Sequence, residues 1–375
     1  MAIPLLDLKR QYIQIREEAI RVTSEIYESQ VFILGNRVVD FEKDFARYCQ
    51  ARYSVGTSSG TDALLIALMV LDLEPGSEVI LPAYSFFATA GVVSRLGLVP
   101  VFAEIDPISY NIDPDDIEKR ITSMTKVIMP VHLYGQMAEM EAIMKIAKKH
   151  QLHVIEDAAQ AVGAEFDGKR AGTFSEIGAF SFFPSKNLGG FGDSGAVTTD
   201  SEALYDKLID FRVHGMRPKY HHKYVGGNFR IDALQAAMLH IKLRYLDEWT
   251  EGRRRNAAMY AEEFEKRGLA GRVVWPTELP RRRHVFNQYV VRFPGEGVRD
   301  RVMNHLKAAG IGCEIYYPLT LPQQECFRGT SNADESFPES DRAARETLAI
   351  PVFTELRKEE IMEVISQIER ALGGS

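Results

Sequence analysis

Short apolar runs rich in β-branched residues alternate with helix-like stretches over residues 55–200, and this alternation restricts the fold more than any other feature. The runs begin at Glu78, Val99, Lys126, His153, Ala179 and Gly195. Segments between them, such as 139–150, place apolar residues at helical spacing and end in lysines, where cations suit the helix dipole. Strands separated by helices in this way form a sheet covered on both faces. The sequence therefore predicts an α/β fold.

The pattern changes near residue 245. Residues 231–269 read as helical over a long span, and short strands and helices follow Trp275-Pro276. With 375 residues and 45% hydrophobic content, the chain is long enough for two cores. We predict a large domain over 1–245 and a small domain over 246–375, packed closely because no linker or low-complexity tract separates them.

Charge and cysteine content exclude several functional classes. The net charge of −7 is spread along the chain without a basic arm, so nucleic acid is not an expected partner. Three widely spaced cysteines form neither a disulfide framework nor a zinc-ligand pair, and the adjacent His221-His222 are a poor metal site, so no metal is expected. No apolar run approaches the ~20 residues that span a bilayer. These features predict a cytoplasmic protein without a membrane partner.

A turn of small residues leads directly into an apolar helical pattern at 56–68. Exposed amides and hydroxyls of Ser58, Ser59, Gly60 and Thr61 would converge at a helix N-terminus, where a phosphate group fits. An ordinary helix N-cap has the same residue types, and the turn alone does not separate the two interpretations.

Two further segments carry reactive side chains. Asp157 ends a buried-strand pattern and is followed by Gln160, at the edge of the sheet where α/β proteins bind ligands. Lys186 lies in a loop of aromatic and glycine residues at 177–195. Burial there would lower the pKa of its amine and favour the neutral nucleophile that condenses with an aldehyde, although a solvated loop lysine is the common alternative.

These features occur together along one chain, and pyridoxal 5′-phosphate needs all of them. Its phosphate needs donors, its ring an aromatic partner, its ring nitrogen a carboxylate and its aldehyde an amine. With the segments 3–8, 35–42 and 348–353, they make the chain resemble the fold-type I aminotransferases of the DegT/DnrJ/EryC1/StrS family over nearly its whole length.

This resemblance implies a large three-layer domain with a mixed sheet and a smaller α+β C-terminal domain. It also implies an enzyme that moves an amino group from L-glutamate to a keto group of a nucleotide-linked hexose, for amino-sugar and polysaccharide or lipopolysaccharide biosynthesis. The cofactor alternates between pyridoxal 5′-phosphate and pyridoxamine 5′-phosphate, and the assembly is a homodimer with shared active sites.

The family pattern also implies a role for individual residues. Lys186 carries the cofactor, Asp157 pairs with the ring nitrogen, and Gln160 contacts the ring hydroxyl. Phe86 stacks on the ring and Ser181 binds the phosphate, which Asn228 reaches from the other subunit. Arg230 is a candidate clamp for the donor carboxylate, with an interface salt bridge as an equal alternative.

The sequence departs from the family pattern at Tyr316 and Pro322, where many members carry histidine, and this leaves the exact sugar open. Tyr316 and Tyr317 are still expected near a sugar or base. Segment 132–136 resembles family members that aminate C3 more than those that aminate C4, while the nucleotide stays undetermined among UDP, dTDP and GDP. Two alternatives remain. One is a sugar dehydratase, which Lys186 disfavours because family members of that type carry histidine in place of this lysine. The other is a cofactor-binding sensor or regulator.

Overall fold

The central sheet has seven strands in the order β1-β9-β8-β5-β4-β2-β3 within residues 2–373, which the computed structural model describes. In that order the strands are Tyr53–Thr57, Gly195–Thr199, Ile177–Ser181, His153–Asp157, Thr125–Ile128, Glu78–Pro82 and Val99–Ala103. β9 runs antiparallel to both neighbours, and every other adjacent pair is parallel. The sheet is therefore mixed, and all six predicted strand regions are confirmed.

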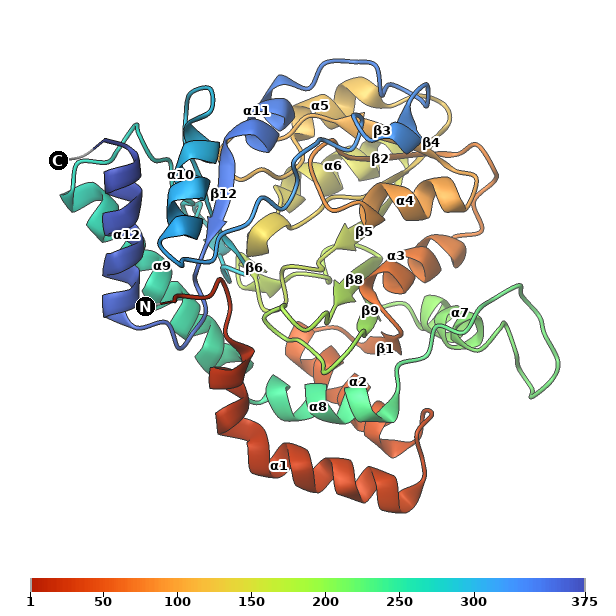
Figure 1. Cartoon of the computed structure of the whole chain (residues 1–375). Coiled ribbons are helices and arrows are strands. Elements are labelled where there is room, and N and C mark those ends of the chain that lie inside the picture. The colour runs from red at the N-terminus through yellow and green to blue at the C-terminus, as the bar shows by residue number, and fades with distance from the viewer. Residues whose placement is uncertain (1, 374–375) are drawn as a thin grey trace.

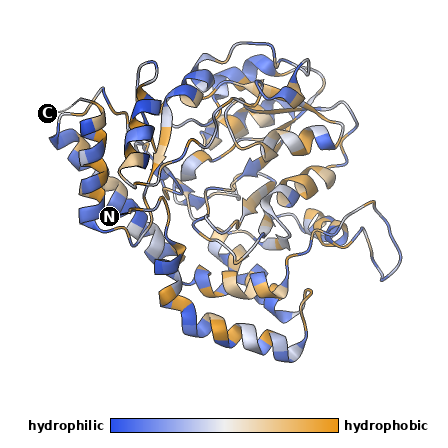
Figure 2. Cartoon of the chain, viewed as in Figure 1, coloured by the Kyte–Doolittle hydropathy of each residue, from blue (hydrophilic) through white to orange (hydrophobic). Residues whose placement is uncertain are grey.

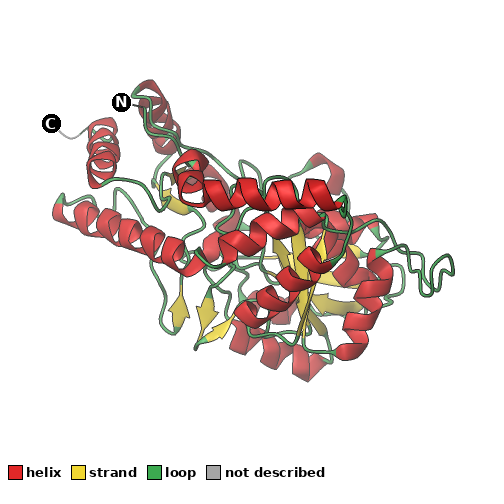
Figure 3. Ribbon diagram, turned by 90° about the horizontal axis from the view of Figure 1, so that it is seen from below, coloured by secondary structure: helices red, strands yellow, loops and turns green. Residues whose placement is uncertain are grey.

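Helices cover both faces of this sheet, which makes three layers (Figure 3). Successive side chains of a strand point to opposite faces, so Val79 and Leu81 of β2 enter one core and Ile80 enters the other. α3 (Gly60–Met69), α4 (Ala88–Arg95) and α7 (Glu202–Arg212) cover the first face. The second is covered by α2 (Asn36–Cys49), α5 (Pro114–Arg120), α6 (Met140–His150) and α8 (Ala233–Leu243).

The elements of the C-terminal part group at one side of the molecule (Figure 1), and they enclose a separate hydrophobic core. It is formed by α9 (Leu246–Lys266), α10 (Val298–Ala308), α12 (Lys358–Ala371) and the antiparallel pair β11 (Tyr289–Arg292) and β12 (Thr347–Ile350). Smaller elements are α11 (Pro338–Glu346) and the strands β6 (Glu165–Phe166), β7 (Lys169–Arg170) and β10 (Arg282–Arg283). Ile3 belongs to this core as well, because its backbone bonds to Gly310 and Gly312.

The domain division at 245/246 stays a prediction. α9 begins at Leu246, so a helix starts where the sequence pattern changes. Among residues 2–373, no helix combines the length and the apolar character that crossing a membrane requires.

α1 (Leu8–Ser29) is apolar on two sides. One side buries Ile15 and Val22 against α8. The other leaves Ile13 75%, Ile20 52% and Tyr27 55% exposed at seven-residue spacing, and Figure 2 shows hydrophobic residues along this outer helix. The loop after α7 projects from the body of the molecule, as Figure 1 shows, and exposes Tyr220 and Val225.

Candidate active site

A cavity of about 390 Å³ lies at the carboxyl edge of the sheet. Asp157 and Ser181, the last residues of β5 and β8, line it, and the start of α3 closes one side. The C-terminal part contributes Gln288, Tyr316 and Tyr317. The predicted residues that line this cavity are Ser59, Gly60, Thr61, Phe86, Asp157, Gln160, Ser181, Lys186, Tyr316 and Tyr317.

Lys186 reaches the cavity from the loop that joins β8 to β9. Its backbone amide donates to the carbonyl of Phe183 at 2.8 Å, and the amide of Gly190 donates to Phe182 at 2.8 Å, so the loop folds back on itself. Burial lowers the pKa of the Lys186 amine to about 8, although the nearby Asp157 carboxylate opposes this shift. The amine is thus a far better nucleophile near neutral pH than an exposed lysine.

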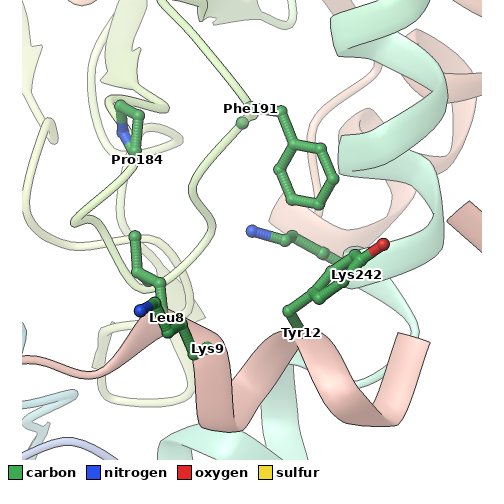
Figure 4. A pocket seen from close by; sticks show the side chains of 7 residues that line it. Leu8, Lys9, Tyr12, Pro184, Phe191 and Lys242 are labelled. Atoms are coloured by element: carbon green, nitrogen blue, oxygen red, sulfur yellow. The ribbon is translucent and has the colours of Figure 1, made fainter. Parts of the chain in front are cut away.

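A second lysine holds this loop from behind. Nζ of Lys242, from α8, donates to the carbonyl of Gly189 at 2.6 Å and lies 4.8 Å from the ring centre of Phe191. Figure 4 shows Lys242 passing beneath Phe191 in a mostly apolar pocket that Leu8 and Tyr12 of α1 also line. Burial lowers the pKa of Lys242 to about 8 as well. The loop that carries Lys186 is therefore anchored to α8.

Asp157 is buried, with 4% of its surface exposed. Oδ2 accepts a hydrogen bond from the Thr89 hydroxyl at 2.9 Å, and Oδ1 accepts one from the Ala159 amide at 3.2 Å. Burial raises the pKa of this carboxyl, and these two hydrogen bonds and Lys186 only partly offset the rise. A cationic group entering the cavity would stabilise the ionised carboxylate.

The start of α3 leaves room for an anion. The Ser59 hydroxyl caps the helix by accepting from the Asp62 amide at 3.0 Å, and the first N–H groups of a helix, here Gly60 and Thr61, have no acceptor within it. A Cβ on Gly60 would lie 2.5 Å from Cβ of Ser181, so only glycine fits against that serine. Ser58 lies outside the cavity lining, since its hydroxyl donates to Asp62 at 2.6 Å.

Gln160 is fixed by two partners. Its Oε1 accepts from the backbone amide of Tyr134 at 2.6 Å, and its Nε2 donates to the Tyr317 hydroxyl at 2.9 Å. The Tyr317 ring meets Tyr84 edge-on at 5.2 Å and stacks on Tyr134 at 6.2 Å. Tyr317 is therefore buried in an aromatic cluster while still lining the cavity.

A fully buried carboxylate, Glu156, precedes Asp157. It accepts from Nε2 of His132 at 2.9 Å and from the amides of Gly172, Phe174 and Ser175. Burial acts to raise the pKa of Glu156, but these hydrogen bonds, led by the one from His132, outweigh it and lower the pKa. Glu156 therefore stays ionised and ties the end of β5 to two loops.

Two other predicted residues lie outside the cavity lining of this chain. Asn228 is exposed at the base of the projecting loop, where its backbone pairs with Val213, and Arg230 is half-buried beside Thr57. The Nε of Arg230 is buried without a hydrogen-bond partner in the described part of the chain. Within residues 2–373, no three His, Cys, Asp or Glu side chains are grouped as a metal site.

The structure adds Thr89, Glu156, Lys242 and Gln288 to the residues that the sequence predicts. Thr89 and Glu156 lie close in the chain to predicted residues, but their residue types do not distinguish them. Lys242 lies in an ordinary helix pattern, so the sequence carries no signal for it.

Comparisons with known proteins cover the whole chain. The sequence profile described as the DegT/DnrJ/EryC1/StrS aminotransferase family matches residues 13–369. A "Pleiotropic regulatory protein" of Geobacillus stearothermophilus is 46% identical over 98% of both chains. A UDP-N-acetyl-3-dehydro-alpha-D-glucosamine 3-aminotransferase of Acidithiobacillus ferrooxidans is 41% identical over 100% of this chain and 99% of its own.

A solved structure supports the same relationship. The crystal structure of Streptomyces venezuelae DesV in complex with a ketimine intermediate superposes with a TM-score of 0.94. That protein is 38% identical, and the match covers 100% of this chain and 99% of the other. The fold-type I architecture expected from the sequence is thereby confirmed.

Proposed function

Since this chain belongs to the DegT/DnrJ/EryC1/StrS aminotransferase family, we propose that it transfers an amino group to a keto group of a nucleotide-linked hexose. The observation that carries the proposal is that Lys186 and Asp157 line one cavity, which the N-terminus of α3 also lines. An amine, a carboxylate and an anion site match the three reactive parts of pyridoxal 5′-phosphate.

The residues fit this cofactor on physical grounds. The space between Gly60 and Ser181, which a Cβ would fill, suits a phosphate group that accepts from the start of α3. Phe86 is 59% exposed and lines the cavity, so its ring face is available for stacking. Asp157 has a raised pKa that a cationic ring nitrogen would bring back down. When bound, the cofactor supplies an aldehyde and an electron-withdrawing ring.

Lys186 and Asp157 then have distinct tasks. With a pKa of about 8, the Nζ of Lys186 is able to accept a proton from a substrate carbon and return one at near-neutral pH. The two oxygens of Asp157, held by Thr89 and Ala159, keep a ring nitrogen protonated.

The substrates follow from the relatives and the cavity. A relative 41% identical is a 3-aminotransferase of a UDP-linked keto-sugar, which supports C3 over C4 as the position aminated. Tyr316, 38% exposed at the cavity, is placed to contact the sugar or base. L-glutamate is the proposed amino donor, and the unpartnered Nε of Arg230 is a group that could pair with its carboxylate.

A homodimer with shared active sites completes the proposal. The exposed stripe of Ile13, Ile20 and Tyr27 is the kind of apolar surface that a second copy covers. Asn228 lies on an exposed loop, where it is free to reach the cofactor phosphate of the partner.

An absorbance spectrum tests the assignment. Purified protein with pyridoxal 5′-phosphate should show a visible band that bleaches when L-glutamate is added, and a UDP- or dTDP-linked 3-keto-hexose should restore it. Lys186→Ala should abolish the band, while Lys207→Ala, which removes an amine that pairs with Asp72 outside the cavity lining, should retain it. A full band in Lys186→Ala would refute the role of that lysine.

A regulator is the second candidate, since the relative 46% identical is a pleiotropic regulatory protein. The complete set of reactive groups in the cavity favours the enzyme. A protein that binds the cofactor but shows no bleaching with any amino donor would support the regulator.

A further inference from the structure

The Gln160 side chain has a fixed orientation. A backbone N–H only donates, so the atom that meets the Tyr134 amide at 2.6 Å must be the oxygen of Gln160. Its amide nitrogen therefore points the other way, toward Tyr317, 2.9 Å away. The nitrogen carries two N–H bonds, and Tyr317 uses one. The second is left for a ligand in the cavity that Gln160 lines.

The Tyr317 hydroxyl is held where it meets this nitrogen. The ring is 7% exposed and is wedged between Tyr84 and Tyr134, at centroid distances of 5.2 and 6.2 Å. Burial raises the pKa of Tyr317, so its hydroxyl keeps its proton. Packing therefore fixes the position of the Tyr317 ring, and its hydroxyl accepts the hydrogen bond from Gln160.

We propose that Tyr317 is a positioning residue, whose hydroxyl turns the free N–H of Gln160 toward the ring hydroxyl of the cofactor. The inference rests on the proposed role of Gln160 in the cofactor site. It gives the C-terminal part of the chain a function in tuning the cofactor, through a residue for which sequence analysis predicts only a contact to the sugar or base.

The cluster contains a matched control. Tyr84 is buried at 1% exposure, and its hydroxyl also makes two side-chain contacts, to Tyr134 at 3.0 Å and Thr347 at 2.9 Å. Tyr84 is not among the residues that line the cavity. Tyr84→Phe and Tyr317→Phe therefore remove the same atom from the same cluster, and only the second touches Gln160.

The experiment measures pyridoxal 5′-phosphate binding and the position of the visible band for both variants, with thermal unfolding by circular dichroism as a fold check. Tyr317→Phe should weaken cofactor binding about threefold to tenfold, as expected for one lost hydrogen bond, and should shift the band. Tyr84→Phe should leave both unchanged. Equal effects from the two variants, or no effect from Tyr317→Phe, would overturn the proposal.

A double variant tests whether Tyr317 acts through Gln160. Gln160→Leu should shift the band in the same direction as Tyr317→Phe, and combining them should add nothing further, because the coupled partner is already gone. Additive shifts, or shifts of opposite direction, would refute the action of Tyr317 through Gln160. If Tyr317→Phe unfolds, the single Gln160→Leu variant still tests the role of Gln160 through its band shift. Absence of a band in the unmodified protein would instead refute the proposed function.

Discussion

Lys186 and Asp157 are each destabilised in their charged form by the same buried surroundings. The pKa of the lysine amine falls and that of the carboxyl rises, while each charge opposes the shift of the other. Neighbouring groups with pKa values pushed toward neutrality are typical of acid–base chemistry. The chemistry therefore depends on burial as much as on residue identity.

The lowered pKa of Lys186 predicts how cofactor capture depends on pH. Only the neutral amine attacks an aldehyde, and it predominates above its pKa. In protein freed of cofactor, the rate of band formation should rise about tenfold per pH unit toward pH 8 and level off above it. The same rates measured with a simple alkylamine in place of the protein, expressed per neutral amine, correct for titration of the cofactor. A rate that climbs to pH 10.5 would show an unshifted lysine.

Within single elements, the residue types predict some parts of the fold and the site but not others. Strands such as β2 and β3 are predictable because burial on both faces requires continuous apolar residues. The sequence pattern does not predict β1, because Tyr53–Thr57 is half polar, or α1, because its apolar residues lie on two sides. The bond between Gln160 and Tyr317 joins residues 157 positions apart, so no local pattern could reveal it.

The junction of α3 and β8 leads to a stability prediction. Gly60→Ala would force a methyl group against Cβ of Ser181, 2.5 Å away, and overpacking of this kind costs about 1–3 kcal/mol of unfolding free energy. Chemical denaturation should show this loss, and dialysis should show weaker retention of the cofactor. Adding Ser181→Gly removes the two closest contacts but leaves Cα of residue 181 at 3.0 Å, so it should recover part of the stability. It should not recover retention, because a phosphate-binding hydroxyl is lost. No rescue of stability would place the strain elsewhere.

At the scale of the whole molecule, some apolar surfaces remain exposed in the single chain. The stripe on α1 and the exposed aromatic residues near the cavity are apolar, and apolar patches of this kind mark interaction sites. Because the fold buries the opposite side of α1 against α8, the helix is able to link a subunit core to a partner.

A charge placed on this stripe should separate the subunits. Ile13→Glu with Ile20→Glu replaces side chains that are 75% and 52% exposed, so the folded subunit should tolerate both changes. Sedimentation should show a dimer in the unmodified protein and a monomer in the double variant. Ile108→Glu, at a 57% exposed position between β3 and α5, is the matched control and should remain dimeric. A dimeric double variant would exclude this stripe as the interface.

The backbone bonds that join Ile3 to Gly310 and Gly312 matter during biosynthesis. Translation reaches Ile3 long before Gly310 and Gly312, so Ile3 stays without these partners while the residues of the sheet are being made. The packing of Ile3 into the C-terminal core is therefore a later event than synthesis of the sheet.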